Sequence, residues 1–295
     1  MNRFLMTTAV AATAVLAACS AKDAPKTDTT TPAQAGAPAA PVSMASFDPA
    51  THVAVVHAKD FAFDAPDSVT SGWTTFHFVN DGPNLHHAQL VRIDSGKTVA
   101  DLEAALKAGP PPKWMIEVGG PNAPDPGSST DATVNLDAGQ YAFICFVDIP
   151  DHVMHYTKGM VRGLKVTAGA AAAAPEPTSD VVVNLSDYSF TVQGGLTAGK
   201  HTFKLVNKGP QPHEIEIVRL APGKTTKDFM SFIAKMDGPP PGNALGGVAG
   251  FRPGTTAYTT VDLTPGNYLL ICFIPDMKDG KPHLEHGMMK EFTVK

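Results

Sequence analysis

The sequence predicts an all-β protein with two tandem antiparallel β-sandwiches, each interrupted by one short helix. Three observations lead to this prediction. The chain has 295 residues, a length that suits two domains with connecting segments better than one domain. Short runs of β-branched and aromatic residues are separated by turns rich in Gly and Pro, with 26 of each in the chain. A long internal repeat divides the chain into two similar halves.

The internal repeat keeps one register over a long stretch of sequence. The matching segments are 78–86 with 205–213, and 136–145 with 263–272. The offset is 127 residues both from His86 to His213 and from Cys145 to Cys272. Such a constant offset indicates an internal duplication.

The predicted domain boundaries follow from the repeat and from composition. We expect one domain at 51–168 and another at 180–295. An Ala- and Pro-rich linker at 169–179 separates them, because it lacks the bulky apolar residues that a packed core needs. For the same reason, residues 20–50 should act as a flexible tether.

Local patterns predict the elements inside each half. Residues 74–78 and 213–217 alternate between the two faces of a strand. A Thr followed three residues later by Asp, at Thr98 and Thr225, predicts the capping box of a helix. The apolar residues that then share one helical face are Leu102, Ala105 and Leu106 in the first half, and Phe229, Phe232, Ile233 and Met236 in the second. A Pro-Pro-Pro stretch should follow the end of each helix.

The N-terminus has the features of an export signal. Arg3 precedes a short apolar run at 5–16, and small residues then lead to Cys19. The Leu-Ala-Ala-Cys sequence resembles the bacterial lipobox, which implies a signal peptide at 1–19 and a lipidated Cys19. Ser20 at the next position resembles the pattern that directs lipoproteins to the outer membrane, facing the periplasm. The alternatives are an ordinary cleaved signal peptide or a short apolar anchor.

Composition limits the classes of function. Charged residues make up only 17% of the chain and its net charge is -5. No basic stripe is present, which argues against nucleic-acid binding. The negative charge would favour a basic redox partner, although charge does not identify one.

Each half also carries the same pattern of candidate metal ligands. A His at the end of an early strand is followed, far downstream, by a Cys, a loop, a second His, four residues and a Met. The two sets are His86, Cys145, His155 and Met160 in the first half, and His213, Cys272, His283 and Met288 in the second. Two imidazoles and a thiolate form a trigonal plane that suits copper, and a weak axial thioether adjusts its reduction potential.

This pattern resembles the cupredoxin family, which includes plastocyanin, amicyanin and azurin. In that family one His comes from an earlier strand, whereas the Cys, the second His and the Met come from the loop between the last two strands. The spacing from His155 to Met160 resembles that of plastocyanin. The resemblance covers nearly all of the folded chain. It implies that each half is a cupredoxin-like Greek-key sandwich that binds one copper ion through the four residues given above.

Two features leave alternatives open. The loop between Cys and second His holds nine residues in the first half and ten in the second, where the family commonly has two to four. Other candidate ligands lie beside the chosen ones, namely His87, His152, His286 and Met289. We choose among them by the register between the halves. The two cysteines could instead be small buried apolar residues, or they could form an inter-domain disulfide.

The favoured function is copper binding by an exported protein, for electron transfer or copper handling in the cell envelope. A redox or copper-delivery protein would then be its partner. The alternative is a metal-free module whose loops bind a protein. An enzyme is disfavoured, because multicopper oxidases need His-x-His and His-Cys-His sequences, which the chain lacks. Copper nitrite reductases need a His beside the Cys, but Ile144 and Phe146 flank Cys145, and the second half has the same two residue types. The sequence does not indicate an oligomeric state.

Overall fold

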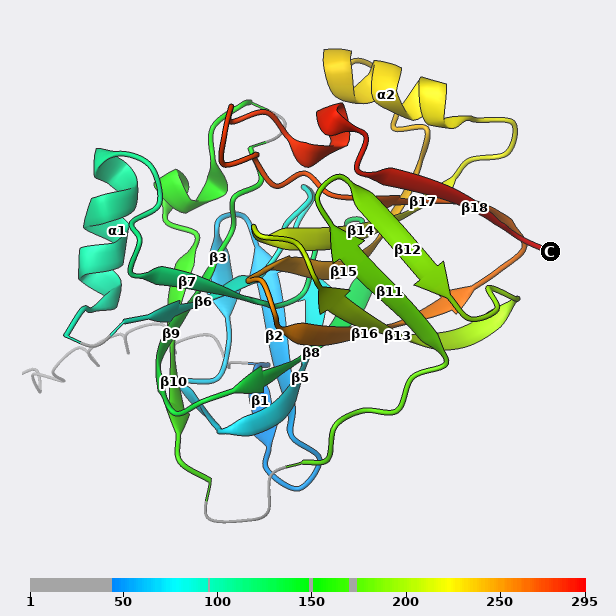
Figure 1. Cartoon of the computed structure of the whole chain (residues 1–295). Coiled ribbons are helices and arrows are strands. Elements are labelled where there is room, and N and C mark those ends of the chain that lie inside the picture. Colours follow the sequence, from blue (N-terminus) through cyan, green and yellow to red (C-terminus); the bar gives the residue numbers. More distant parts are fainter. Residues whose placement is uncertain (1–43, 95, 149–150, 170–173) are drawn as a thin grey trace, which may run out of the picture. The chain divides into compact units, whose positions relative to one another are not determined.

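The computed structural model describes residues 44–94, 96–148, 151–169 and 174–295 (Figure 1). Within these ranges the chain is mostly β, with two α-helices and two short 3-10 helices. No helix in these ranges is long and apolar enough to cross a membrane. The predicted signal peptide, Cys19 and the first part of the tether lie outside the described residues, so the prediction of a lipid anchor is untested.

The repeat recurs as a repeated order of elements. The first half forms β1 (Ser46–Asp48), β2 (Val53–Lys59), β3 (Ala62–Asp64), β4 (Ser68–Thr70), β5 (Gly72–Asn80), β6 (Gln89–Ile93), α1 (Val99–Ala108), β7 (Met115–Gly119), β8 (Ser129–Leu136), β9 (Gly139–Ile144), η1 (His155–Lys158) and β10 (Val161–Thr167). The second half forms β11 (Val181–Ser186), β12 (Ser189–Gln193), β13 (Gly199–Asn207), β14 (His213–Leu220), α2 (Thr226–Lys235), β15 (Gly242–Phe251), β16 (Thr256–Leu263), β17 (Gly266–Ile271), η2 (His283–His286) and β18 (Met289–Val294).

Both halves contribute strands to the same two sheets. One sheet has the order β1-β2-β5-β8-β16-β13-β11-β12, with β3 also paired to β2. The other has the order β18-β17-β14-β15-β7-β6-β9-β10-β4. Each sheet therefore continues from one half into the other, through β8 and β16 in the first sheet and β7 and β15 in the second. That each half is a separate Greek-key domain within the predicted boundaries stays a prediction.

The pairing between the halves joins residues that occupy the same position in the repeat. Ala132 of β8 pairs with Thr259 of β16, 127 residues further along the chain. Pro121 forms an isolated bridge with Val248, which is again its own repeat equivalent. The neighbouring pairs are arranged symmetrically about these positions, because both contacts are antiparallel. The halves are thus related by a local two-fold axis.

The direction of three strand pairs differs from the predicted antiparallel arrangement. Most described strand pairs are antiparallel, as predicted, but β5 lies parallel to β2 and β13 lies parallel to β11. A short parallel pair also joins β10 to β4. Antiparallel neighbours can be joined by a tight hairpin, whereas β2 and β5 are separated by β3 and β4, which gives the chain room to return in the same direction.

The two helices begin where the sequence predicts. Thr98 accepts a hydrogen bond from the backbone N–H of Asp101, and the Asp101 carboxylate accepts one from the backbone of Thr98. Thr225 and Asp228 form the same capping box in α2. Each Pro-Pro-Pro stretch follows the helix end, as predicted. Helix α1 covers a small apolar cluster on β6, β7 and β9, and α2 covers the corresponding cluster on β14 and β17.

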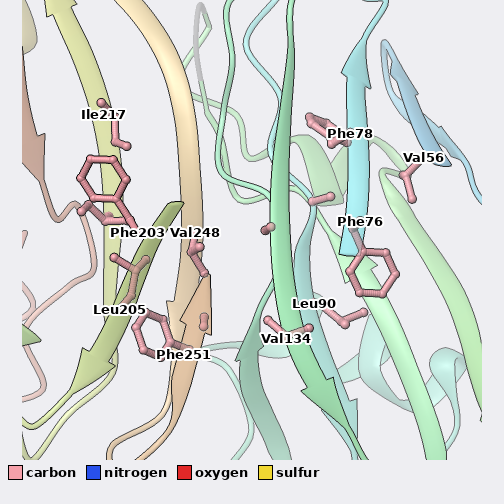
Figure 2. Packing of buried hydrophobic residues seen from close by; sticks show 14 of the residues in the cluster. Val56, Phe76, Phe78, Leu90, Val134, Phe203, Leu205, Ile217, Val248 and Phe251 are labelled. Carbon is pink, nitrogen blue, oxygen red and sulfur yellow. The ribbon is translucent and has the colours of Figure 1, made fainter. Parts of the chain in front are cut away.

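The main hydrophobic core lies between the two sheets and includes side chains from both halves. Figure 2 shows Phe76 and Val134 from the first half, and Phe203, Val248 and Phe251 from the second. All five are at most 1% exposed. Cysteine and methionine residues of both candidate ligand sets belong to this core, so the fold holds them rigidly.

Candidate metal centres

The upstream histidine of each set is fully buried and is fixed by contact with a partly exposed carboxylate. His86 follows β5, and its Nε2 lies 2.5 Å from Oδ1 of Asp60 in the turn after β2. His213 begins β14, and its Nε2 lies 3.0 Å from Oδ1 of Asp187 in the turn after β11. Because a carboxylate only accepts, Nε2 of each ring carries the proton, and Nδ1 keeps its lone pair for another ligand.

A glycine makes room for each of these contacts. A Cβ on Gly82 would lie 2.8 Å from Nε2 of His86, and a Cβ on Gly209 would lie 2.4 Å from Nε2 of His213. Any larger residue would have to displace the imidazole. The two glycines are 127 residues apart and belong to the repeat.

In the first half, three potential ligand atoms converge. Cys145 directly follows β9, and His155 begins the 3-10 helix η1. Nδ1 of His86 lies 3.0 Å from Nδ1 of His155. The Cys145 Sγ lies 3.5 Å from Nδ1 of His155 and 3.9 Å from Nδ1 of His86. All three side chains are fully buried.

The second half repeats this arrangement. Nδ1 of His213 lies 3.1 Å from Nδ1 of His283, the first residue of η2. The Cys272 Sγ lies 3.3 Å from Nδ1 of His283. The three ligand atoms lie within 4.8 Å of one another, as they do in the first half. Both cysteines are free thiols, so they form no disulfide.

The methionines lie next to the cysteines in the backbone hydrogen-bond pattern. Cys145 N donates to Met160 O at 3.2 Å, and Met160 N donates to His155 O at 3.1 Å. The second half has the same two bonds, with lengths of 3.3 Å and 3.0 Å. A glycine with a positive φ, Gly159 at 104°, ends the 3-10 helix and turns the chain toward Met160. Both methionine side chains are fully buried.

Burial keeps the converging groups neutral. It raises the pKa of the Cys145 thiol to about 12 and also raises that of Cys272. It lowers the pKa of His86 and of His213, and brings that of His283 to about 4. His86, His213 and His283 therefore offer neutral imidazole nitrogens, and each thiol must release its proton when it binds a metal.

The donor set and its spacing fit a transition-metal ion. Ligands bound at about 2.0–2.3 Å in a trigonal plane lie about 3.5 Å apart, and the nitrogen and sulfur atoms here are 3.0–3.9 Å apart. Two imidazoles, a thiolate and a nearby thioether are the ligands that copper favours in electron-transfer sites. These residues can thus hold copper without a change in the surrounding strands.

The structure distinguishes the chosen ligands from the alternative candidates that lie near them in the sequence. His87 points away from the centre, and its Nε2 accepts a hydrogen bond from Phe146 N at 2.8 Å. His152 is exposed, whereas His286 and Met289 are only partly buried. None of these four belongs to either His–Cys–His group. The register between the halves therefore selects residues that converge, although metal binding by them stays a prediction.

Sequence reasoning missed the residues that surround the imidazoles. Besides the two aspartates, an aromatic ring covers each second histidine. Phe61 lies 4.8 Å from His155 and Tyr188 lies 5.6 Å from His283, measured between ring centroids. The Asp-aromatic pairs at 60–61 and 187–188 are 127 residues apart, so the repeat offset would have identified them.

At both centres a buried side chain accepts the backbone N–H of the residue that follows the cysteine. Phe146 N beside Cys145 donates to His87, and Phe273 N beside Cys272 donates to Oε1 of Glu214 at 2.7 Å. Burial lowers the pKa of His87 to about 4 and raises that of Glu214 to about 7. Between the halves, the Asn122 side-chain amide donates to Ile215 O at 3.3 Å.

Three carboxyl groups lie where the halves meet, and we call them the interface carboxylate cluster: Glu117, Glu214 and Glu216. Glu216 accepts hydrogen bonds from Ala123 N of the first half and Gly246 N of the second, both at 3.1 Å. Burial raises the pKa of Glu117 and of Glu214 to about 7, and raises that of Glu216 well above its usual range. The cluster therefore places titratable groups where the halves meet.

Comparisons with known proteins identify only partial similarities. No protein-family profile and no curated protein sequence matches the chain. Auracyanin B is 22% identical, with a TM-score of 0.30, over 43% of this chain and 96% of its own. A dithionite-reduced auracyanin from Roseiflexus castenholzii is 22% identical, with a TM-score of 0.26, over 39% and 95%. A multicopper oxidase is 14% identical, with a TM-score of 0.26, over 85% and 92%. Because these TM-scores are low, we interpret the centres from their own residues.

Proposed function

We propose that this chain is an exported, copper-binding, cupredoxin-like protein that transfers electrons or handles copper in the cell envelope. The observation that carries the proposal is the convergence of two imidazole nitrogens and one thiol at both repeat positions. At each, a buried methionine accepts a backbone hydrogen bond from the cysteine. One convergent group could be a chance core arrangement. Two groups at the same offset, built from the same residue types, favour a shared function.

The chain's own residues would do three things at each centre. Asp60 and Asp187 orient the upstream imidazoles, so that Nδ1 faces the centre. The sheet and the following 3-10 helix hold Cys and the second His in fixed positions, which limits rearrangement between oxidation states. Phe61 and Tyr188 cover the second imidazoles and keep water away from them. Copper, when bound, would supply a one-electron couple.

We further propose that each half is a Greek-key cupredoxin-like sandwich, at 51–168 and 180–295, and that the chain is not an enzyme. The hydrophobic residues flanking both cysteines support the second point, because they leave no ligand for an adjacent catalytic copper. A lipid on Cys19 would place the protein on the outer membrane, facing the periplasm, where a redox or copper-delivery partner could reach it.

Visible spectroscopy with metal analysis tests the proposal. Residues 20–295 are loaded with copper, and the absorption is compared with that of Cys145→Ser and Cys272→Ser. A thiolate bound to copper gives an intense visible band, so each substitution should remove its own share of the band and one copper per chain. His87→Gln is the matched control, because His87 points away from the centre and Gln still offers an acceptor to Phe146 N.

Other outcomes would change the assignment. Folded protein that binds copper without the intense band would favour copper storage or delivery over electron transfer. Folded protein that binds no copper would refute the proposal and leave the metal-free module that binds a protein partner.

A further inference from the structure

The loop between Cys272 and His283 carries a second group of potential metal ligands. Asp276, Asp279 and His286 each offer one ligand atom, and these atoms lie within 4.8 Å of one another. Nε2 of His286 lies 3.2 Å from Oδ1 of Asp279. None of the three residues belongs to either of the centres described above.

The backbone and side chains of the loop hold Asp276 in place. It is only 3% exposed. Its Oδ2 accepts hydrogen bonds from the Tyr188 hydroxyl at 2.6 Å and the Gln211 amide at 2.9 Å. Its backbone N–H donates to Lys281 O at 2.8 Å, and its carbonyl accepts from Gly280 N at the same distance. Its Oδ1 accepts from Lys278 N at 2.7 Å. The loop thus closes on itself and holds the carboxylate in one orientation.

A second observation also points to a ligand at this place. Nε2 of His283 is fully buried and has no hydrogen-bond partner within the described part of the chain. It faces the same loop, 3.7 Å from Oδ2 of Asp276. A buried polar atom without a partner is costly. A water bound to an ion in this loop would donate a hydrogen bond to that nitrogen.

The first half shows what the same loop does without the histidine. The residue that corresponds to His286 is Lys158, three residues into its 3-10 helix. Its Nζ pairs with both carboxylate oxygens of Asp151 at 2.7–2.8 Å, and it lies 4.3 Å from the centroid of the Phe61 ring. The first loop therefore neutralises its own carboxylate with a fixed cation. In the second loop His286 takes the place of Lys158: it lies beside Asp279 and, at 4.8 Å between ring centroids, beside Tyr188. Unlike a lysine, an imidazole can serve as a metal ligand.

We propose that Asp276, Asp279 and His286 form a binding site for a divalent transition-metal ion. Two carboxylates and one imidazole suit Cu(II) and Zn(II), and they disfavour Cu(I), which prefers sulfur ligands. Two negative charges and a partly exposed imidazole let an ion enter from solvent. Since its ligands are distinct from those of the copper centres, the site does not depend on the proposed function.

Zinc titration of the whole chain without its thiol ligands tests this proposal. In residues 20–295 carrying Cys145→Ser and Cys272→Ser, isothermal titration gives the number of Zn(II) ions bound per chain. Adding His286→Lys should lower that number by one, because Lys gives the loop the ion pair that Lys158 gives the first loop. His152→Lys is the matched control, since His152 is the exposed histidine of the first loop. It should leave the number unchanged.

A second readout identifies the ligands. With Cu(II) as the probe, the electron paramagnetic resonance spectrum of the added ion should show hyperfine coupling to the nitrogen of His286. Both His286→Lys and Asp279→Asn should abolish that signal, whereas circular dichroism should stay unchanged. An unchanged zinc count in His286→Lys, or an equal loss in His152→Lys, overturns the proposal. If only the copper centres fail, the chain with both cysteines intact lacks the visible band. The number of zinc ions bound by the variant without thiols is then unaffected.

Discussion

The interface carboxylate cluster makes stability depend on pH in a way that one substitution should reveal. Glu117 lies on β7, and burial raises its pKa from 4.5 to about 7. A group whose pKa is raised on folding binds its proton more tightly in the folded chain. The contribution of Glu117 to stability is therefore most favourable below pH 4.5, falls as the pH rises toward 7, and is constant above that.

The expected magnitude follows from the shift. A difference of about 2.5 pKa units corresponds to about 3 kcal/mol at 1.36 kcal/mol per unit. Glu117→Gln replaces the carboxyl by a neutral group of the same shape. We therefore expect it to raise the free energy of unfolding by up to about 3 kcal/mol at pH 8 and to change it little at pH 5. Burial and the neighbouring Glu117 charge both raise the pKa of Glu214, so removing that charge acts in the same direction.

Urea unfolding of the metal-free chain at pH 5, 6, 7 and 8 measures this difference. Glu103→Gln, on helix α1 and outside the cluster, is the control for the loss of one carboxyl. It should change stability equally at each pH. The reasoning fails if Glu117→Gln changes the free energy of unfolding equally at pH 5 and pH 8. Burial would then not destabilise the ionised carboxylate.

Three further predictions concern the centres and the join between the halves. Asp187→Ala should weaken copper binding at the second centre about 10–100-fold, because the imidazole loses the carboxylate that orients it; chelator competition in a Cys145→Ser background measures this, and unchanged affinity would contradict the role. Gly209→Ala should abolish copper binding at that centre, since its Cβ would lie 2.4 Å from a ligand imidazole. Gly195→Ala, with nothing within 4 Å of its Cβ, should not; equal spectra for the two variants would refute the steric argument. Residues 180–295 expressed alone should self-associate, because β15 and β16 lose their partners, and a stable monomer in light scattering would falsify this expectation.

The sequence predicted the features that depend on local patterns or on the repeat. Thr98 and Thr225 identified both helix starts, because a capping box is a short, specific pattern. The offset between halves selected His86 over His87 and His155 over His152, and the structure places the selected residues together.

Other features left no such pattern in the sequence. A strand such as β8 has the same alternation whether its edge faces solvent or pairs with β16, so the continuous sheets could not be foreseen. The interface carboxylate cluster was also missed, because a Glu within an alternating strand reads as a solvent-facing residue. The burial of Glu216, for example, depends on the first half of the chain, which packs against it.

The two-fold pairing of β8 with β16 has a consequence for what the duplication permits. It is an isologous interface, the kind that two identical protomers form, but here it lies within one polypeptide. In a homodimer every residue at the interface occurs twice, so Glu214 and Glu216 would bring four carboxyl groups into one dry interior. The fused chain has His87 and Gln89 at the equivalent positions instead. The duplicated chain thus keeps the symmetry of its backbone, while the first-half equivalents of Glu214 and Glu216 carry no carboxyl group.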